Sequence, residues 1–418
     1  MHPIVVLLLD GLGDRAHASL GGRTANEAAR TPNLDALASR GSTGVLYAIG
    51  PGRAPSSEVA HWSMLGYLPD EFPNRAVFEA LGAEQEVSPD DVFAFAALRP
   101  ADRRNGELWL TGRPAYGEDE EEGAALVDRC ADIEVDGLRF MLSHLRRGEA
   151  VLRVSGGADH RVTDSDAFFR DRHPVLRPQA AHPDAARTAR AAEQWTRVVI
   201  ERLAGERFNV ITLKWWGRWR PVPTFLERHG VTGSFIAESR FLHGLGRAVG
   251  LAPVEAPETD EPATDLRERL RLVRELREAG ETFVFVHLKA ADAAGHTKDP
   301  ATKQRTIEVL DGELGALRAL ESQAIVCVTG DHATPAYPDV IHSGDPVPLV
   351  VAGPGVRADP VESFGELDCS RGLLGQLRGP DLMPLLLNAA DRPLFLGSRP
   401  TPFRAADGYP ALLEPLRL

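Results

Sequence analysis

Short apolar runs bounded by turn residues recur along this chain, and they restrict its fold more than any other feature of the sequence. They occupy residues 4–9, 283–288, 325–329 and 348–352. Runs of this length are typical of strands that are buried on both faces of a parallel sheet. Helical patterns lie between them, at residues 266–279 and 302–320. The alternation of strand and helix predicts an α/β fold.

The middle of the chain differs in composition. Between about residue 100 and about residue 215 it carries an acidic run at 118–122 and an arginine-rich stretch at 170–187, with few strand patterns. The length of 418 residues also exceeds the roughly 100 to 200 residues of a usual domain. We therefore predict a discontinuous core formed by residues 1–85 and 216–418, with an inserted domain at residues 86–215.

Charge and cysteine content exclude several classes of function. The chain has 47 Lys and Arg against 60 Asp and Glu, a formal net charge of −13. Nucleic acids and anionic membranes attract clustered positive charge, so neither is an expected partner, although an anionic small substrate is compatible. The three cysteines, at positions 130, 327 and 369, form no paired motif, which indicates a reducing, cytoplasmic compartment. The first apolar run has six residues and no basic leader, which predicts a buried strand rather than a signal peptide.

Carboxylates and imidazoles gather where the predicted strands end. The second run is followed by Asp292 and His296, and Asp10 follows the first run, while the third is followed by Asp331, His332 and His342. The carboxyl ends of parallel strands line the crevice in which α/β sheets bind ligands. Mixed Asp and His ligands are typical of Zn²⁺ and Mn²⁺ sites, and a pair of ions suits phosphoryl transfer. The alternative is that these are separate hydrogen-bonded loop residues, with Asp10 as a helix cap.

Two serines, Ser56 and Ser57, precede a helix that we expect to begin near Glu58. A hydroxyl at a helix N-terminus lies beside unpaired backbone N–H groups, which also bind phosphate oxygens. A metal ion bound to that hydroxyl would lower its pKa and make it a nucleophile. The alternative is a serine that only caps the helix.

Several motifs, taken in order, resemble a known family. They are DGLGD at 10–14, GGRTANEAARTPNLDALASRG at 21–41, PSSEVAHWSMLGY at 55–67, HLKAADAAGH at 287–296, TGDHATP at 329–335 and HSGDPVPLVVAGPGV at 342–356. This ordered set resembles the cofactor-independent (2,3-bisphosphoglycerate-independent) phosphoglycerate mutases of the archaeal type, within the alkaline phosphatase superfamily. The resemblance implies an alkaline-phosphatase-like core, with a mostly parallel sheet flanked by helices, and an inserted α+β cap domain.

The resemblance also implies roles for individual residues. One divalent ion would be held by Asp10, Ser57, Asp331 and His332, and a second by Asp292, His296 and His342. Ser57 occupies the position of the family's phosphorylated serine, and Lys289 falls where a cation could neutralise the transferring group. Mn²⁺ or Zn²⁺ are the expected ions, and such ligands also accept Co²⁺ or Mg²⁺.

The activity implied by the resemblance is the interconversion of 3-phosphoglycerate and 2-phosphoglycerate through a phosphoserine. One alternative keeps the chemistry and changes the substrate, giving a mutase or phosphatase that acts on another phosphorylated or phosphonate acid. A second alternative is a catalytically silent homologue that serves as a binding protein, which the filled metal-ligand positions disfavour.

The chain departs from the family where the substrate is bound. Lys214 and Trp215 replace the family's Arg-Gly pair, and Asn74, Arg75 and Ala76 replace its Gly-Arg-Gly. Two more segments differ, at residues 93–98 and 166–168. Because lysine does not reproduce the bidentate grip of arginine, we expect altered acid recognition, with Lys214, Arg218 and Arg75 as the candidate substrate-binding residues. The tryptophans near Lys214 are read either as a pocket wall or as ordinary core residues.

Overall fold

A computed structural model describes residues 2–112, 120–167, 172–257, 259–393 and 414–418. The chain divides into two compact units, one formed by Met1–Phe72 with Val222–Leu418 and the other by Pro73–Pro221. The sequence places the boundaries of the insertion at residues 86 and 215. The second unit begins earlier because helix α4 (Arg75–Gly82) packs against two of its strands, β3 (Val92–Arg99) and β9 (Val210–Gly217).

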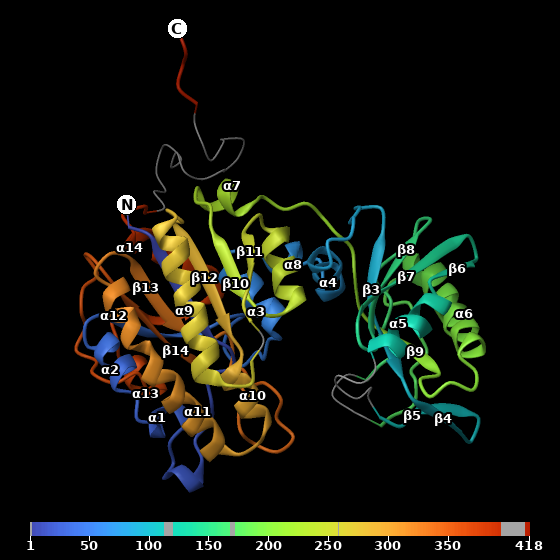
Figure 1. The fold of residues 1–418 in the computed structure, drawn as a ribbon, viewed down its shortest axis with the longest axis horizontal. Coiled ribbons are helices and arrows are strands. Elements are labelled where there is room, and N and C mark those ends of the chain that lie inside the picture. The colour runs from blue at the N-terminus through green and yellow to red at the C-terminus, as the bar shows by residue number, and fades with distance from the viewer. Residues whose placement is uncertain (1, 113–119, 168–171, 258, 394–413) are drawn as a thin grey trace. The chain divides into compact units, whose positions relative to one another are not determined.

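The first unit is built on a mixed sheet with the strand order β11-β10-β12-β1-β13-β14-β2-β15 (Figure 1). The strands are β1 Ile4–Leu9, β2 Ser42–Tyr47, β10 Ser234–Ala237, β11 Ala252–Glu255, β12 Phe283–Leu288, β13 Ile325–Thr329, β14 Val347–Ala352 and β15 Gly375–Arg378. Among these described strands, β14 is antiparallel to both of its neighbours and every other pairing is parallel. The prediction of a mostly parallel α/β sheet is therefore confirmed.

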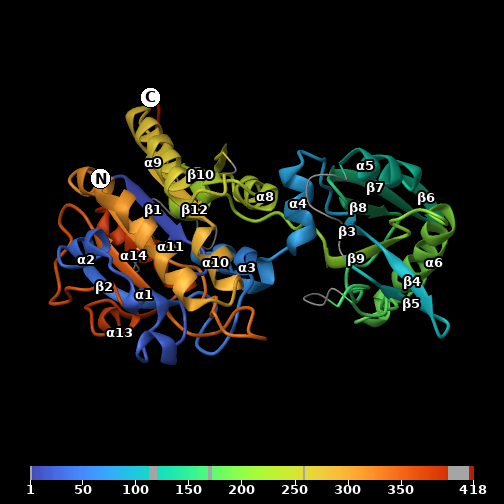
Figure 2. The ribbon, with the colours of Figure 1, turned by 60° about the horizontal axis from the view of Figure 1, so that its bottom comes forward.

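Helices cover both faces of this sheet (Figures 1 and 2). On one face, α2 (Pro32–Ala38), α9 (Pro262–Glu278) and α11 (Pro300–Glu313) bury leucines and valines against β1, β12 and β13. On the other face lie α3 (Ser57–Met64), α8 (Arg240–Ala248) and α14 (Gly379–Ala389). The short helices are α1 Ala25–Ala28, α7 Phe225–His229, α10 Ala290–His296, α12 Leu317–Leu320 and α13 Glu366–Cys369. Covered on both sides, β1 has all six of its residues buried, as its unbroken apolar run predicts.

The second unit is an α+β structure around an antiparallel sheet with the order β6-β7-β8-β3-β9. Its further strands are β6 Asp132–Val135, β7 Leu138–Arg146 and β8 Glu149–Ser155, with a separate hairpin of β4 (Ala101–Arg104) and β5 (Glu107–Leu110). Helices α5 (Glu120–Arg129) and α6 (Ala186–Arg202) pack on the sheet, where Trp195 stacks on Phe140 in the core. Across the described residues, no helix combines the length and the apolar character that crossing a membrane requires.

A buried glutamate makes the stability of the first unit depend on pH. Glu366 accepts a 2.8 Å hydrogen bond from the Thr24 hydroxyl, and burial raises its pKa from 4.5 to about 7. Because the protonated form is favoured in the folded state, its stabilising contribution is complete below pH 4.5 and is lost as the pH rises through about 7. The variant Glu366→Gln stays neutral at every pH. Above about pH 7 we expect its free energy of unfolding to exceed that of the wild type by on the order of 3 kcal/mol, and below pH 4.5 we expect the two to match. Urea unfolding at several pH values measures the difference, and a pH-independent gap would contradict the assignment.

Candidate metal centre

The residues predicted as metal ligands follow three neighbouring strands. Strand β1 lies between β12 and β13, with Leu9 aligned to Leu288 and Leu8 aligned to Thr329. Asp10 directly follows β1, α10 begins two residues after β12, and Asp331 comes two residues after β13. Because these strands are parallel, their carboxyl ends meet at one edge of the sheet, where side chains from distant parts of the chain come together.

The first group consists of Asp10, Asp331 and His332, all buried, with ligand atoms within 4.8 Å of one another. His332 Nε2 lies 3.3 Å from Asp10 Oδ1 and 3.3 Å from Asp331 Oδ2. Ser57 Oγ lies 3.2 Å from the same nitrogen. Ser57 is the first residue of α3, and Ser56 stands at the N-cap without a capping side-chain hydrogen bond. The structure thus brings together all four residues predicted around one ion.

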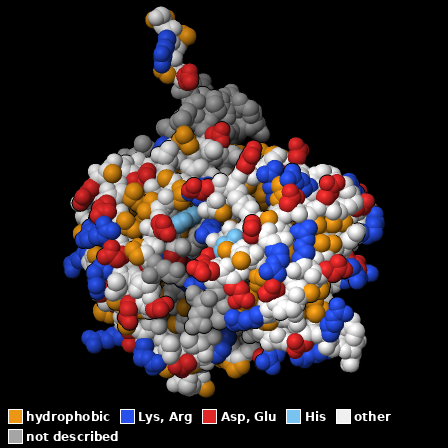
Figure 3. Space-filling view, turned by 45° about the vertical axis from the view of Figure 1, so that its right-hand side comes forward, with side chains coloured by type: hydrophobic (Ala, Val, Ile, Leu, Met, Phe, Trp, Pro, Cys, Tyr) orange, Lys and Arg blue, Asp and Glu red, His pale blue; other side chains and the backbone are white. Residues whose placement is uncertain are grey.

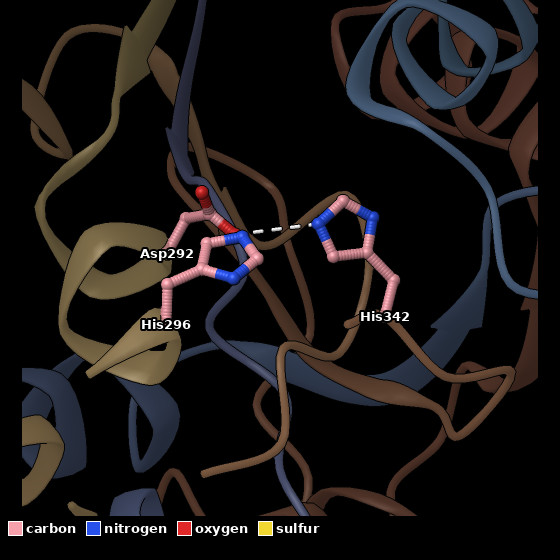
Figure 4. A group of neighbouring side chains, drawn as sticks. All are labelled: Asp292, His296 and His342. Atoms are coloured by element: carbon pink, nitrogen blue, oxygen red, sulfur yellow. Dashed lines mark ion pairs between the residues drawn. The ribbon is translucent and has the colours of Figure 1, made fainter. Parts of the chain in front are cut away.

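The second group consists of Asp292, His296 and His342 (Figure 4). Asp292 and His296 lie one turn apart on α10, and their side chains point toward His342, which lies in the loop after β13. His296 Nε2 is 3.3 Å and His342 Nε2 is 3.6 Å from Asp292 Oδ1. The ring of His342 stacks on that of His332 with centroids 3.8 Å apart, so the two groups are adjacent.

The electrostatics of the first group suit a cation. Burial, reinforced by the neighbouring carboxylates, raises the pKa of Asp10, and burial also raises that of Asp331. Burial lowers the pKa of His332 to about 4, so its ring is neutral and able to ligate. Asp10 Oδ1 and Asp331 Oδ2 are buried without a hydrogen bond. Unpaired buried carboxylate oxygens are costly unless a positive charge compensates them, and a divalent ion among Asp and His ligands does so. The residues present therefore fit a metal ion.

Two histidines that the sequence did not single out also contact the first group. His287 Nε2 lies 2.9 Å from Asp10 Oδ2 and its Nδ1 lies 3.4 Å from Glu238 Oε2. Burial favours the neutral ring, but Glu238 and Asp10 outweigh it and raise the pKa of His287 to about 10. His61, one helical turn after Ser57, contacts the Ser57 carbonyl at 2.6 Å, and burial lowers its pKa to about 3. Two signals in the sequence could have identified these histidines. His287 is the single polar residue of the apolar strand β12, and His61 follows Ser57 by four residues on helix α3.

Lys289 stands at the N-cap of α10 and is exposed. It lines a hollow of about 370 Å³ together with Glu238, Asp265 and Arg269. No contact between Lys289 and either Asp/His group occurs among the interactions of the described residues, so its predicted role in neutralising a transferring group remains a prediction.

The predicted substrate-binding residues all lie in the second unit. The Arg75 guanidinium is 4.4 Å and the Lys214 ammonium 4.5 Å from the centre of the Trp215 ring, so these two cations share one aromatic platform. Arg218 instead donates a hydrogen bond to the Ala158 carbonyl. Trp215 has a φ of 56°, in the left-handed region that glycine occupies without strain. A glycine would adopt this conformation without strain, which is compatible with the prediction that Trp215 stands in place of a glycine.

Comparisons with known proteins agree with this fold. A family model described as "Metalloenzyme superfamily" matches residues 2–389. A 2,3-bisphosphoglycerate-independent phosphoglycerate mutase from Methanopyrus kandleri is 37% identical over 413 residues, which cover 93% of this chain and 96% of the relative. Among solved structures, a protein from Pyrococcus horikoshii has a TM-score of 0.78 at 28% identity, covering 95% of this chain and 99% of its own. A cofactor-independent phosphoglycerate mutase from Thermoplasma acidophilum has a TM-score of 0.65 at 27% identity, covering 93% of this chain and 100% of its own.

The α/β sheet with two Asp/His groups at its strand ends agrees with the family model, and the chain belongs to the metalloenzyme superfamily that this model describes. Within that class, the chain belongs to the family of 2,3-bisphosphoglycerate-independent phosphoglycerate mutases. The family predicted from the ordered motifs is thereby confirmed, and so is the prediction that the protein is an isomerase-type enzyme.

Proposed function

We propose that this protein interconverts 3-phosphoglycerate and 2-phosphoglycerate through a phosphoserine at Ser57, with two divalent ions. The observation that carries the proposal is the position of Ser57 Oγ, 3.2 Å from His332 Nε2 in the first Asp/His group, with the second group adjacent. A hydroxyl at a helix N-terminus beside a metal-ligand group can accept a phosphoryl group.

The ligands divide between the ions as the family resemblance implies. Asp10, Ser57, Asp331 and His332 would hold one ion, and Asp292, His296 and His342 the other, with Mn²⁺ or Zn²⁺ as the best match to these atoms. When bound, such ions supply charge neutralisation for phosphoryl oxygens and lower the pKa of the serine hydroxyl. His287 hydrogen-bonds to Asp10 and holds that carboxylate in place.

The proposed reaction consists of two phosphoryl transfers, one to Ser57 and one from it. Ser57 Oγ forms a bond to phosphorus while the bond between phosphorus and the 3-oxygen of glycerate breaks, and the serine proton passes to that oxygen. The retained glycerate then turns, its 2-hydroxyl oxygen bonds to phosphorus, and Ser57 recovers its proton as the phosphoserine bond breaks. Backbone N–H groups in the first turn of α3 would bind phosphoryl oxygens.

Cations outside the Asp/His groups would recognise the acid. Lys289 would neutralise the transferring group, and Lys214, Arg218 and Arg75 would bind the substrate carboxylate or phosphate. The inserted domain, predicted at residues 86–215, would retain glycerate and keep water from the phosphoserine.

One observation favours a second candidate function. By the family resemblance, Lys214 and Trp215 stand in place of an Arg-Gly pair, and Trp215 adopts a left-handed backbone conformation that is unfavourable for it. A mutase or phosphatase for another phosphorylated or phosphonate acid would account for that change. The net charge of −13 disfavours a nucleic-acid substrate, and on the face drawn in Figure 3 basic and acidic side chains are interspersed.

An enolase-coupled assay with 3-phosphoglycerate and Mn²⁺ tests the proposed activity. We expect turnover that a chelator removes and added Mn²⁺ restores, because the ligand groups require a cation. Hydrolysis of p-nitrophenyl phosphate under the same conditions, without turnover of 3-phosphoglycerate, would favour the second candidate. Absence of both activities, together with no bound metal in elemental analysis, would instead favour a binding homologue.

A further inference from the structure

A threonine hydroxyl connects the two Asp/His groups. Thr334 Oγ1 lies 2.7 Å from Asp292 Oδ1 in the second group and 3.2 Å from His332 Nδ1 in the first. The Thr334 side chain belongs to a fully buried residue, with a relative exposure of 0%. A single oxygen therefore contacts one proposed ligand of each ion.

The chemistry of these contacts fixes the direction of both hydrogen bonds. A carboxylate can only accept, so the one O–H of Thr334 donates to Asp292. The lone pairs of the same oxygen then accept from His332, which places the ring proton of His332 on Nδ1. His332 Nε2 is left with a lone pair directed at Asp10 and Asp331, 3.3 Å from an oxygen of each. The hydroxyl thus selects the tautomer that can ligate.

The backbone around Thr334 leaves it little freedom. A Cβ at Gly11 would lie 2.5 Å from Thr334 Oγ1 and 2.8 Å from the Asp292 backbone, and one at Gly295 would lie 2.4 Å from the Thr334 carbonyl. Lys303 Nζ donates a 2.9 Å hydrogen bond to that carbonyl. Glycines on two sides and a lysine on a third hold the hydroxyl where both contacts form.

We propose that Thr334 is a positioning residue that couples the two metal groups, by orienting His332 for one ion and Asp292 for the other through one hydroxyl. The inference rests on the proposed occupation of both groups by divalent ions. A partner that orients a metal ligand typically changes metal affinity about 10- to 100-fold when it is removed. Since Thr334 contacts both groups, its loss is expected to weaken both ions, rather than one.

Isothermal titration of the metal-free protein with Mn²⁺ tests this coupling, supported by the electron paramagnetic resonance spectrum of the loaded protein. We expect Thr334→Val, which keeps the shape and removes the hydroxyl, to weaken both binding steps about 10- to 100-fold. Spin coupling between paired Mn²⁺ ions should fall at the same time. Thr334→Ser, which restores the hydroxyl, should return both affinities to within about threefold of the wild type.

Thr329→Val is the matched control, because Thr329 is equally buried and its hydroxyl donates to the Pro348 carbonyl rather than to a ligand. We expect this variant to bind Mn²⁺ as the wild type does. Two ions bound by Thr334→Val with wild-type affinity would overturn the coupling and leave the proposed function standing. A wild type that binds no divalent ion would overturn both.

Discussion

Ser57→Ala is expected to abolish mutase activity, with a loss of at least about a thousandfold in kcat, because the variant has no oxygen to receive the phosphoryl group. The Ser57 hydroxyl approaches His332 Nε2 to 3.2 Å, and α3 starts at this residue. Acid quenching after addition of ³²P-labelled 3-phosphoglycerate should trap label on the wild type and none on the variant. Elemental analysis of the variant should still find metal, since the other predicted ligands remain.

Ser56→Ala is the matched control for this experiment. The Ser56 hydroxyl donates to Glu58 Oε1 at 2.8 Å and makes no capping bond to the helix backbone. We therefore expect the variant to keep the labelled phosphoprotein and an activity within about tenfold of the wild type. Label that persists in Ser57→Ala and disappears in Ser56→Ala would show that the neighbouring serine is the nucleophile.

The strand-end ligands could be located from the sequence because each follows a short apolar run, and parallel strands bring their carboxyl ends to one edge. Strand β1 has the predicted bounds, and Asp10 follows it directly. The histidine tautomers could not be predicted this way, since they depend on contacts between distant segments. His342 Nδ1, for example, contacts the Pro55 carbonyl at 2.9 Å, and this leaves Nε2 facing Asp292.

In the second unit, strands β6 and β7 were harder to predict because they alternate buried and exposed residues and pair in an antiparallel sheet. Strand β7 alternates in this way from Leu138 to Ser143, and such alternation is a weaker signal than an unbroken apolar run. One helix boundary also differs from the prediction, since α9 begins at Pro262, four residues before the predicted start at residue 266. The strained backbone of Trp215 could be found only in the structure, since a tryptophan gives no local signal for a left-handed φ.

Lys303 was visible in the sequence only as an unusual residue, one of the few lysines in a chain whose basic residues are almost all arginine. In the structure it is fully buried on α11, and its ammonium donates to the carbonyls of Gly11, Gly13 and Thr334 at 2.8, 2.7 and 2.9 Å. It therefore joins the loop that carries Asp10 to the loop that carries Asp331 and His332. An ammonium has three donors around one atom, which suits three converging carbonyls better than the planar fork of arginine.

Lys303→Met is expected to lower the free energy of unfolding by about 3 to 5 kcal/mol. The substitution removes the ammonium that contacts three buried carbonyls and lies 3.9 Å from the Asp14 carboxylate. Methionine keeps the length of the apolar stem, so the loss reports the charge and not a cavity.

Lys298→Met provides the comparison for this prediction, because the half-buried Lys298 ammonium also donates to two carbonyls, those of Pro335 and Val340, but water can replace it there. Its loss should cost about 1 kcal/mol or less. Urea unfolding of both metal-free variants measures the difference, and Mn²⁺ titration of Lys303→Met should show weakened binding, since the two ligand loops are no longer held together. An unfolding free energy for Lys303→Met within 1 kcal/mol of the wild type would mean that packing alone holds these loops in register.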